Sequence, residues 1–173
     1  MQVRLDKRAR IIADGGQAYP VDLLRDHTLV QVRQKYTDDT GELTLAPGEE
    51  TTDEVTVGGR VVFVRNTGKL CFASLQDGFT ETSNGERLQI MLSKAEVGDE
   101  SLAAWKSDVD LGDHVWVRGR VVVSRRGELS IMAAEWRLAS KALRPLPTLH
   151  KELSEETRVR RRYADLVVRE ESR

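Results

Sequence analysis

The stretch EVTVGGRVVFVRNTGKLCFASLQDG, residues 54–78, reads as two strands joined by a tight turn at Thr67-Gly68. Its first half is rich in valine, which favours a strand, and it is interrupted by Gly58-Gly59. Paired glycines inside a strand are typical of a sharp bend, as at the corner of a small barrel. This stretch therefore predicts a bent first strand followed directly by an antiparallel second strand.

The second strand divides its side chains between two faces. Alternation places Cys71, Ala73 and Leu75 together, and these small apolar groups suit a core. The other face consists of Leu70, Phe72, Ser74 and Gln76. An aromatic ring on this more polar face has two interpretations. Phe72 either closes one end of the barrel or packs under a helix, or it stacks on a ligand ring.

Three later stretches extend the strand pattern, at residues 86–93, 113–125 and 127–140, and a short helical pattern at 101–109 precedes the second of them. Three strands, a short helix and two strands are the order of an OB-fold, a five-stranded, partly open barrel that often binds oligonucleotides. Other small barrels fit the pattern alone. The bent first strand and the helix between strands 3 and 4 favour the OB-fold.

The chain divides into three parts. Residues 1–53 predict an N-terminal helix, from Val3 to about Ala13, and an acidic loop, both packed on the barrel. Residues 54–143 are predicted to form the barrel. Residues 144–173 predict a proline-stiffened connector and a helix capped at Ser154, which we expect to be the truncated start of another domain.

Composition excludes several classes of function. The formal net charge is −1, so only a local basic surface could attract a polyanion. Cys71 is the single cysteine, which suits a reducing cytoplasm and a buried small side chain. No apolar run is long enough to cross a bilayer, so we expect no membrane contact by this chain. No catalytic constellation and no metal-ligand cluster are evident, and we predict no catalytic residue and no metal site.

Basic and aromatic side chains supply further expectations. The N-terminal helix carries Arg4, Lys7, Arg8 and Arg10, which indicate either a solvated face or a helix that contacts an RNA backbone. If that helix face is only solvated, phosphates would be held by arginines of the barrel, namely Arg118, Arg120, Arg125 or Arg126.

Core packing is predicted for the tryptophans, Trp105, Trp116 and Trp136.

Four segments of the sequence resemble a known protein family: GRVVFVRNTGKLCFASLQDG, GELSI, KALRPLP and RVRRRYADLVVREESR. Together they resemble the bacterial lysyl-tRNA synthetases, which are class II aminoacyl-tRNA synthetases. KALRPLP followed by an R-x-R-Y-x-D-L pattern is specific for that family, whereas the sister aspartyl and asparaginyl enzymes usually differ there. The similarity covers nearly the whole chain.

The resemblance implies that the barrel binds the anticodon loop of the lysine tRNA. It implies that Phe72 stacks on the central uridine, that Gln89 reads the same base, and that Glu128 accepts a hydrogen bond from it. Arg65 matches a family arginine that can donate to a base carbonyl or a phosphate. One departure is the hairpin at residues 77–89, which is longer than the usual family spacing.

The resemblance also bears on the parent protein. The second and third class II motifs are absent, so ATP and Mg²⁺ would be bound by a missing catalytic domain and no cofactor by this chain. A cytoplasmic homodimer is implied. An alternative parent is a bifunctional fusion that makes lysylphosphatidylglycerol, with this module as the cytoplasmic part of a membrane protein. A general single-strand-binding OB module and a protein-interaction barrel are the alternatives from other classes.

Overall fold

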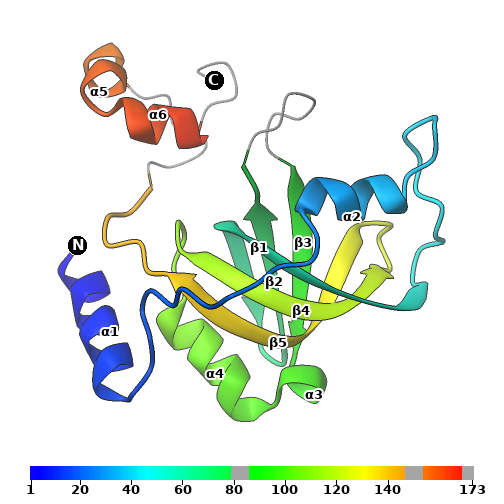
Figure 1. Cartoon of the computed structure of the whole chain (residues 1–173), viewed down its shortest axis with the longest axis horizontal. Coiled ribbons are helices and arrows are strands. Elements are labelled where there is room, and N and C mark those ends of the chain that lie inside the picture. The colour runs from blue at the N-terminus through cyan, green and yellow to red at the C-terminus, as the bar shows by residue number, and fades with distance from the viewer. Residues whose placement is uncertain (79–85, 147–153, 169–173) are drawn as a thin grey trace.

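A computed structural model describes residues 1–78, 86–146 and 154–168 of the protein (Figure 1). The described elements are α1 (Gln2–Ala13), α2 (Leu29–Lys35), β1 (Glu50–Thr67), β2 (Leu70–Gln76), β3 (Arg87–Ser93), α3 (Lys94–Val97), α4 (Asp99–Asp108), β4 (His114–Val123), β5 (Leu129–Ser140), α5 (Glu155–Arg160) and α6 (Arg162–Val168).

The strands form a closed barrel in the order β1-β2-β3-β5-β4. Strand β1 is long enough to pair with both β4 and β2, and it passes from one partner to the other around Arg60. The ring closes where β3 pairs with β5 in the parallel direction. The five-stranded barrel, the N-terminal helix and the helices between β3 and β4 confirm the predicted architecture.

The barrel interior is an apolar core to which two helices contribute. The predicted inner face of β2 is confirmed, because Cys71, Ala73 and Leu75 are at most 1% exposed. Burial raises the pKa of the Cys71 thiol, so this cysteine behaves as a small apolar side chain. Helix α4 inserts the fully buried Trp105 into this core, and α2 inserts Leu29 and Val32.

Strand β1 contains a bulge that changes which side chains face the core. Its pairing with β2 runs from Val61 opposite Leu75 to Phe63 opposite Ser74, so Val62 is an extra residue. Val61 and Val62 are both buried, and Phe63 then points outward with 54% of its surface exposed. Beyond a bulge the alternation restarts in the opposite phase, and side chains are re-aimed.

The loop before β4 holds the backbone at this bulge. The N–H of Val61 donates to the carbonyl of Asp113 at 2.8 Å, and the N–H of Gly112 donates to the carbonyl of Val61 at 2.7 Å. Both backbone groups of Val61 are therefore satisfied beside an irregular part of the ladder.

A buried lysine joins that loop to the segment after β5. The side chain of Lys141 is fully buried, and its Nζ donates to the carbonyl of Asp108 and to the carboxylates of Asp110 and Asp113 at 2.6–2.7 Å. Asp113 is also buried, and it accepts the backbone N–H groups of Asp110 and Ala142 at 2.8 Å each. Each donor of the ammonium thus has an acceptor, as a buried charge requires.

Several sequence expectations need correction. Strand β1 begins at Glu50 rather than at Glu54, so the end of the expected acidic loop belongs to the barrel. Trp105 and Trp136 pack edge to face with their centroids 5.1 Å apart, but Trp116 lies outside the core and donates from Nε1 to the carbonyl of Leu24 at 2.7 Å.

The single helix expected from Ser154 onward is interrupted. Ser154 caps α5 as predicted, but the backbone at Arg161 leaves the helical region and a separate helix, α6, follows. The break allows Arg158 and Arg162 to approach opposite oxygens of the buried Asp165 carboxylate, at 3.6 and 3.1 Å. The hairpin residues 79–85, Pro147 of the connector and residues 148–153 lie outside the described residues.

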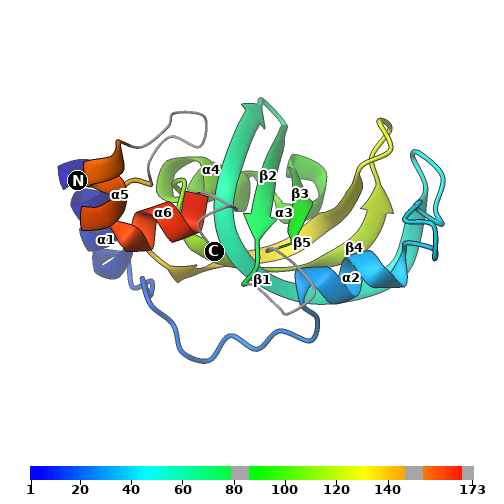
Figure 2. The same cartoon turned by 90° about the horizontal axis from the view of Figure 1, so that it is seen from above.

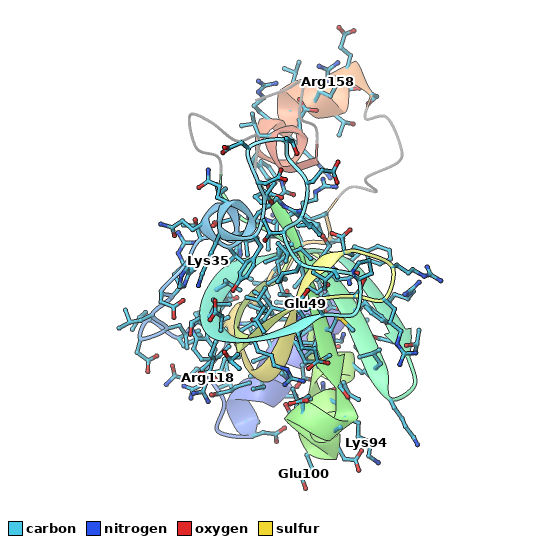
Figure 3. The ribbon with its side chains drawn as sticks, turned by 90° about the vertical axis from the view of Figure 1, so that its right-hand side faces the viewer. Lys35, Glu49, Lys94, Glu100, Arg118 and Arg158 are labelled. Carbon is cyan, nitrogen blue, oxygen red and sulfur yellow. The ribbon has the colours of Figure 1, made fainter. Side chains whose placement is uncertain are left out.

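Charged side chains of both signs are spread over the surface, as the labelled residues in Figure 3 illustrate. Within the described ranges, no helix has the length and hydropathy that crossing a membrane requires.

The bulged pairing of β4 and β5 generates a first prediction. A Cβ atom at Gly119 would lie 2.0 Å from the carbonyl oxygen of Met132 on β5. Because backbone atoms cannot move away cheaply, we expect Gly119→Ala to lower the free energy of unfolding by at least about 2 kcal/mol in urea titration. Gly58→Ala is the matched control, since its Cβ would meet only Val115 at an ordinary 3.7 Å. Equal stability of the two variants would contradict this packing.

The cluster of Lys141 with Asp110 and Asp113, called the lysine cluster below, generates a second prediction. Burial alone would raise the pKa of Asp110, but hydrogen bonds from Lys141 and Lys7 outweigh it and hold the pKa below the usual 3.8. A lowered folded-state pKa contributes stability that is present above the unfolded pKa and lost as pH falls through the folded pKa. We expect the unfolding free energy of the wild type to fall more steeply below about pH 4 than that of Asp110→Asn. If the unfolding free energies of the wild type and of Asp110→Asn depended on pH in the same way, the Asp110 carboxylate would not be stabilised by this cluster.

Candidate nucleic-acid interface

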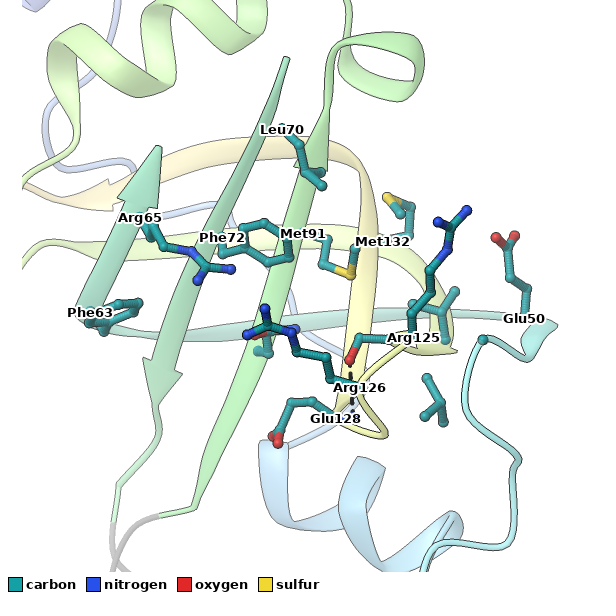
Figure 4. A pocket seen from close by; sticks show the side chains of 15 residues that line it. Glu50, Phe63, Arg65, Leu70, Phe72, Met91, Arg125, Arg126, Glu128 and Met132 are labelled. Carbon is teal, nitrogen blue, oxygen red and sulfur yellow. Dashed lines mark hydrogen bonds between the residues drawn. The ribbon is translucent and has the colours of Figure 1, made fainter. Parts of the chain in front are cut away.

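A groove of about 860 Å³ lies on the outer surface of the barrel, between β1, β2 and β3 on one side and the β4–β5 turn on the other (Figure 4). Its lining includes all four residues that the family resemblance singled out, namely Arg65, Phe72, Gln89 and Glu128. They come from four separate segments of the chain, so it is the fold that brings them together.

The aromatic member of this set is supplied by β2. Phe72 is half-buried on the outer face, opposite the core residues Cys71 and Ala73, and the predicted outward direction is confirmed. It pairs across the strands with Arg65 of β1. The guanidinium carbon of Arg65 lies 4.7 Å from the centroid of the Phe72 ring, a cation–π contact that covers one face of the ring.

Gln89 is held by a hydroxyl on the neighbouring strand. Its Nε2 donates to Oγ of Ser130 at 2.9 Å, and that hydroxyl donates to the carbonyl of Glu128 at 2.9 Å. The second N–H and the Oε1 of the amide remain for another partner. Gln89 pairs with Ser74 of β2, which fixes its side chain on the groove face and settles the register across the long hairpin.

Glu128 lies at the end of the β4–β5 turn, and its carboxylate is 3.9 Å from a guanidinium nitrogen of Arg33 in α2. Arg33 is itself anchored, because its Nε donates to Glu86 at 2.6 Å. Sequence reasoning missed α2 and Arg33. A signal was available in Thr28 and Gln31, which form a capping box with reciprocal hydrogen bonds of 3.1 and 2.8 Å.

Apolar side chains form the floor of the groove. Leu70, Met91 and Met132 accompany Phe72, and Met91 lies opposite Met132 in the parallel pairing of β3 with β5. Phe63 also lines the groove and was missed by sequence reasoning. Strict alternation from the inward Val57 and Val61 would have placed it in the core, and only the bulge turns it outward.

Two arginines at the β4–β5 turn form a rim of positive charge. Arg125 and Arg126 are exposed, line the groove, and have no ion pair with the described part of the chain. The other two barrel arginines singled out in the sequence are occupied. Arg118 approaches Glu54 and Glu135 at 3.5 and 3.1 Å, and Arg120 bridges two further carboxylates at 3.0 Å, those of Glu50 and Glu96.

The basic residues of α1 contact the protein itself. Arg4 donates to the backbone carbonyls of Leu111 and Ala142 at 2.8 and 3.0 Å. The guanidinium of Arg8 lies 5.6 Å from the centroid of the Tyr19 ring. These contacts fasten the helix to the barrel although none of its residues is buried.

Two further α1 cations pair with carboxylates around the lysine cluster. Lys7 lies 2.8 Å from Asp110, and Arg10 pairs with Asp108. Both views of the fold place α1 at one end of the molecule and the β4–β5 turn at the other (Figures 1 and 2). The expectation that the α1 cations hold an RNA backbone stays a prediction, and in this structure their charges are used for intramolecular contacts.

The groove combines a ring, an amide, a carboxylate and several guanidinium groups above an apolar floor. Single-stranded nucleic acids are commonly bound in this way, by stacking on an aromatic side chain, hydrogen bonding to base edges and cationic contacts to the backbone. Within the described ranges, no group of three or more His, Cys, Asp and Glu side chains could hold a metal ion.

Comparison with known proteins agrees with this arrangement. Residues 55–139 match the family model of the OB-fold nucleic acid binding domain. The chain is 60% identical over its whole length to a lysine–tRNA ligase of Kineococcus radiotolerans, and 56% identical over 99% of its length to one of Mycolicibacterium gilvum. It spans 32% of the length of each of these relatives.

A further relative has a longer chain. The protein is 37% identical over its whole length to the lysylphosphatidylglycerol biosynthesis bifunctional protein LysX of Rhodococcus jostii, of which it spans 14%. The barrel, the groove and these similarities lead to one conclusion. The chain belongs to the OB-fold nucleic acid binding domains, as the anticodon-binding domain of the lysyl-tRNA synthetase family.

Proposed function

We propose that the groove binds the anticodon loop of a lysine tRNA, with the central uridine stacked on Phe72. One observation carries this proposal: Arg65, Phe72, Gln89 and Glu128, taken from four segments, line a single groove. The similarity to lysine–tRNA ligases supports the identity of the RNA.

The polar groups of the groove complement the edge of uracil. That edge presents a carbonyl, an N–H and a second carbonyl. The carboxylate of Glu128 would accept from the N–H, and the free N–H of Gln89 would donate to a carbonyl. Ser130 holds the Gln89 amide in place before the RNA arrives, which lowers the cost of ordering it.

Arg65 would change partners when RNA binds. In the free protein its exposed guanidinium covers a face of the Phe72 ring at 4.7 Å. We infer that the base replaces the guanidinium on that face, and that Arg65 turns to a base carbonyl or a phosphate. The ring thereby exchanges a cation–π contact for a stacked base, and the cation gains a charge-assisted hydrogen bond.

The parent protein is part of the same proposal. We infer a cytoplasmic, homodimeric lysine–tRNA ligase, whose ATP and Mg²⁺ would be bound by a catalytic domain outside this chain. A bifunctional lysylphosphatidylglycerol-forming protein is the second candidate, since the chain is also similar to LysX over its whole length. The higher identities to the ligases, 60% and 56% against 37%, favour the first.

Base reading by Glu128 yields a testable prediction. A cytidine at the centre of the anticodon presents a lone pair where uridine presents an N–H, so the carboxylate no longer has a donor. We expect the cytidine stem-loop to bind about 1–3 kcal/mol more weakly in a calorimetric titration. Glu128→Gln should largely abolish the difference, because an amide can donate to the cytidine nitrogen.

The same titration separates the alternatives. A general single-strand-binding module would bind a scrambled loop as tightly as the lysine-type loop. A protein-interaction barrel would bind neither. Equal affinity of the wild type for uridine and cytidine loops would refute the reading of the central base.

The rim arginines yield a prediction about salt. We expect Arg125→Gln/Arg126→Gln to bind both cognate and scrambled loops more weakly. The slope of log affinity against log salt should flatten by about 0.7 for each phosphate that the variant no longer neutralises. Arg118→Gln is the matched control, because its charge is already paired with Glu54 and Glu135.

The N-terminal helix enters this experiment as the competing source of positive charge for the RNA backbone. Neutralising Arg4, Lys7, Arg8 and Arg10 should lower the melting temperature, because these side chains fasten the helix to the barrel, and should leave the salt slope unchanged. A flattened slope in the helix variant with an unchanged slope in Arg125→Gln/Arg126→Gln would assign the RNA backbone to α1 instead.

A further inference from the structure

The bulge in β1 creates an exposed aromatic side chain inside the groove. Val61 and Val62 are 0% and 3% exposed, and the next residue, Phe63, is 54% exposed. If β1 continued in regular alternation without the bulge, Phe63 would share the inward face of Val61. Single exposed apolar residues are common on protein surfaces, but this ring lines a groove that already carries Phe72.

The strand register sets the two rings side by side. Phe63 is paired with Ser74, and Arg65 with Phe72, so the two phenylalanines are diagonal neighbours on the outer face of β1 and β2. Diagonal neighbours on paired strands lie about 7–8 Å apart, a separation that two aromatic groups can share. Figure 4 shows both rings on this side of the groove, with Arg65 between them.

The surroundings of the two rings differ in chemistry. Phe72 is paired with Met91 and is therefore a diagonal neighbour of Gln89 on β3, whose amide can read a base edge. The cross-strand neighbour of Phe63 is Ser74, a half-buried serine, and its neighbour along the strand face is Arg65. A ring with a cation beside it supports stacking and a phosphate contact, but it offers little to discriminate one base from another.

We propose that Phe63 forms a second nucleobase subsite, which stacks the nucleotide adjacent to the one on Phe72. The inference rests on the proposed function, since it assumes that single-stranded RNA occupies the groove. The second subsite accepts any base, because every base presents a π face. The groove thus holds two successive nucleotides, one read by its edge and the other held by stacking alone.

The test measures binding of anticodon stem-loops to the chain, with abasic nucleotides placed in turn at each of the three anticodon positions. We expect Phe63→Leu to bind the intact loop about tenfold more weakly. When the loop is abasic at one of the two flanking positions, Phe63→Leu and the wild type should bind that loop equally tightly. Phe72→Leu should show the same pattern with the loop that is abasic at the centre.

Three variants or measurements control this comparison. Phe63→Tyr keeps a π face and should retain wild-type affinity. Tyr163→Leu removes an aromatic side chain that is 58% exposed in α6, outside the groove, and should leave affinity unchanged. Melting temperatures of Phe63→Leu and the wild type should agree, because the ring is more than half exposed.

The outcomes separate the two proposals. Wild-type affinity of Phe63→Leu together with weakened binding by Phe72→Leu would overturn the second subsite and leave the groove assignment intact. Wild-type affinity of both variants would overturn the proposed function itself. An independent readout uses the wild-type chain: 2-aminopurine at the flanking position should be quenched on binding, and the absence of quenching at both flanking positions would also overturn the subsite.

Discussion

The groove depends on one irregularity, the bulge of β1 at Val62. The bulge is stable because the loop at Gly112 and Asp113 satisfies both backbone groups of Val61. That loop is in turn held by the buried ammonium of Lys141, which binds the Asp113 carboxylate at 2.7 Å. A polar cluster at the base of the barrel therefore supports the phase change that turns Phe63 and Arg65 toward the groove. In some proteins a buried ion pair is retained because it fixes one particular arrangement of the chain, and not because it maximises stability.

The second requirement is the parallel pairing of β3 with β5. It places Gln89 beside Ser130 and so joins the amide to the turn that carries Glu128. The same strands present Ile90 and Ile131 to the core. A shift of one residue in this register would exchange the groove residues with the core residues, so the burial of the core protects the geometry of the groove.

Much of this could be predicted from the sequence, and the exceptions have physical causes. Burial alternates along β3 and along β2 as far as Leu75, so the inward Leu75 and the outward Phe72 were predicted correctly, whereas Gln76, expected on the more polar face, is buried. The bulge interrupts alternation in β1, and periodicity therefore could not find Phe63. Helix α2 is short, and only its capping box indicates it. The cations of α1 were expected to be solvated or to bind phosphate, but their partners lie far away in sequence, as with Lys7 and Asp110. Such pairings cannot be read from local patterns.

We propose that RNA occupies the groove with its central anticodon base on Phe72. The most direct measurement is photocrosslinking of the chain to an anticodon stem-loop that carries 4-thiouridine at the central position, followed by mass spectrometry of the crosslinked peptide. We expect crosslinks to β2 and β3, at Phe72 or Met91, which share the floor of the groove. Crosslinks confined to α1 or to α4 would contradict it.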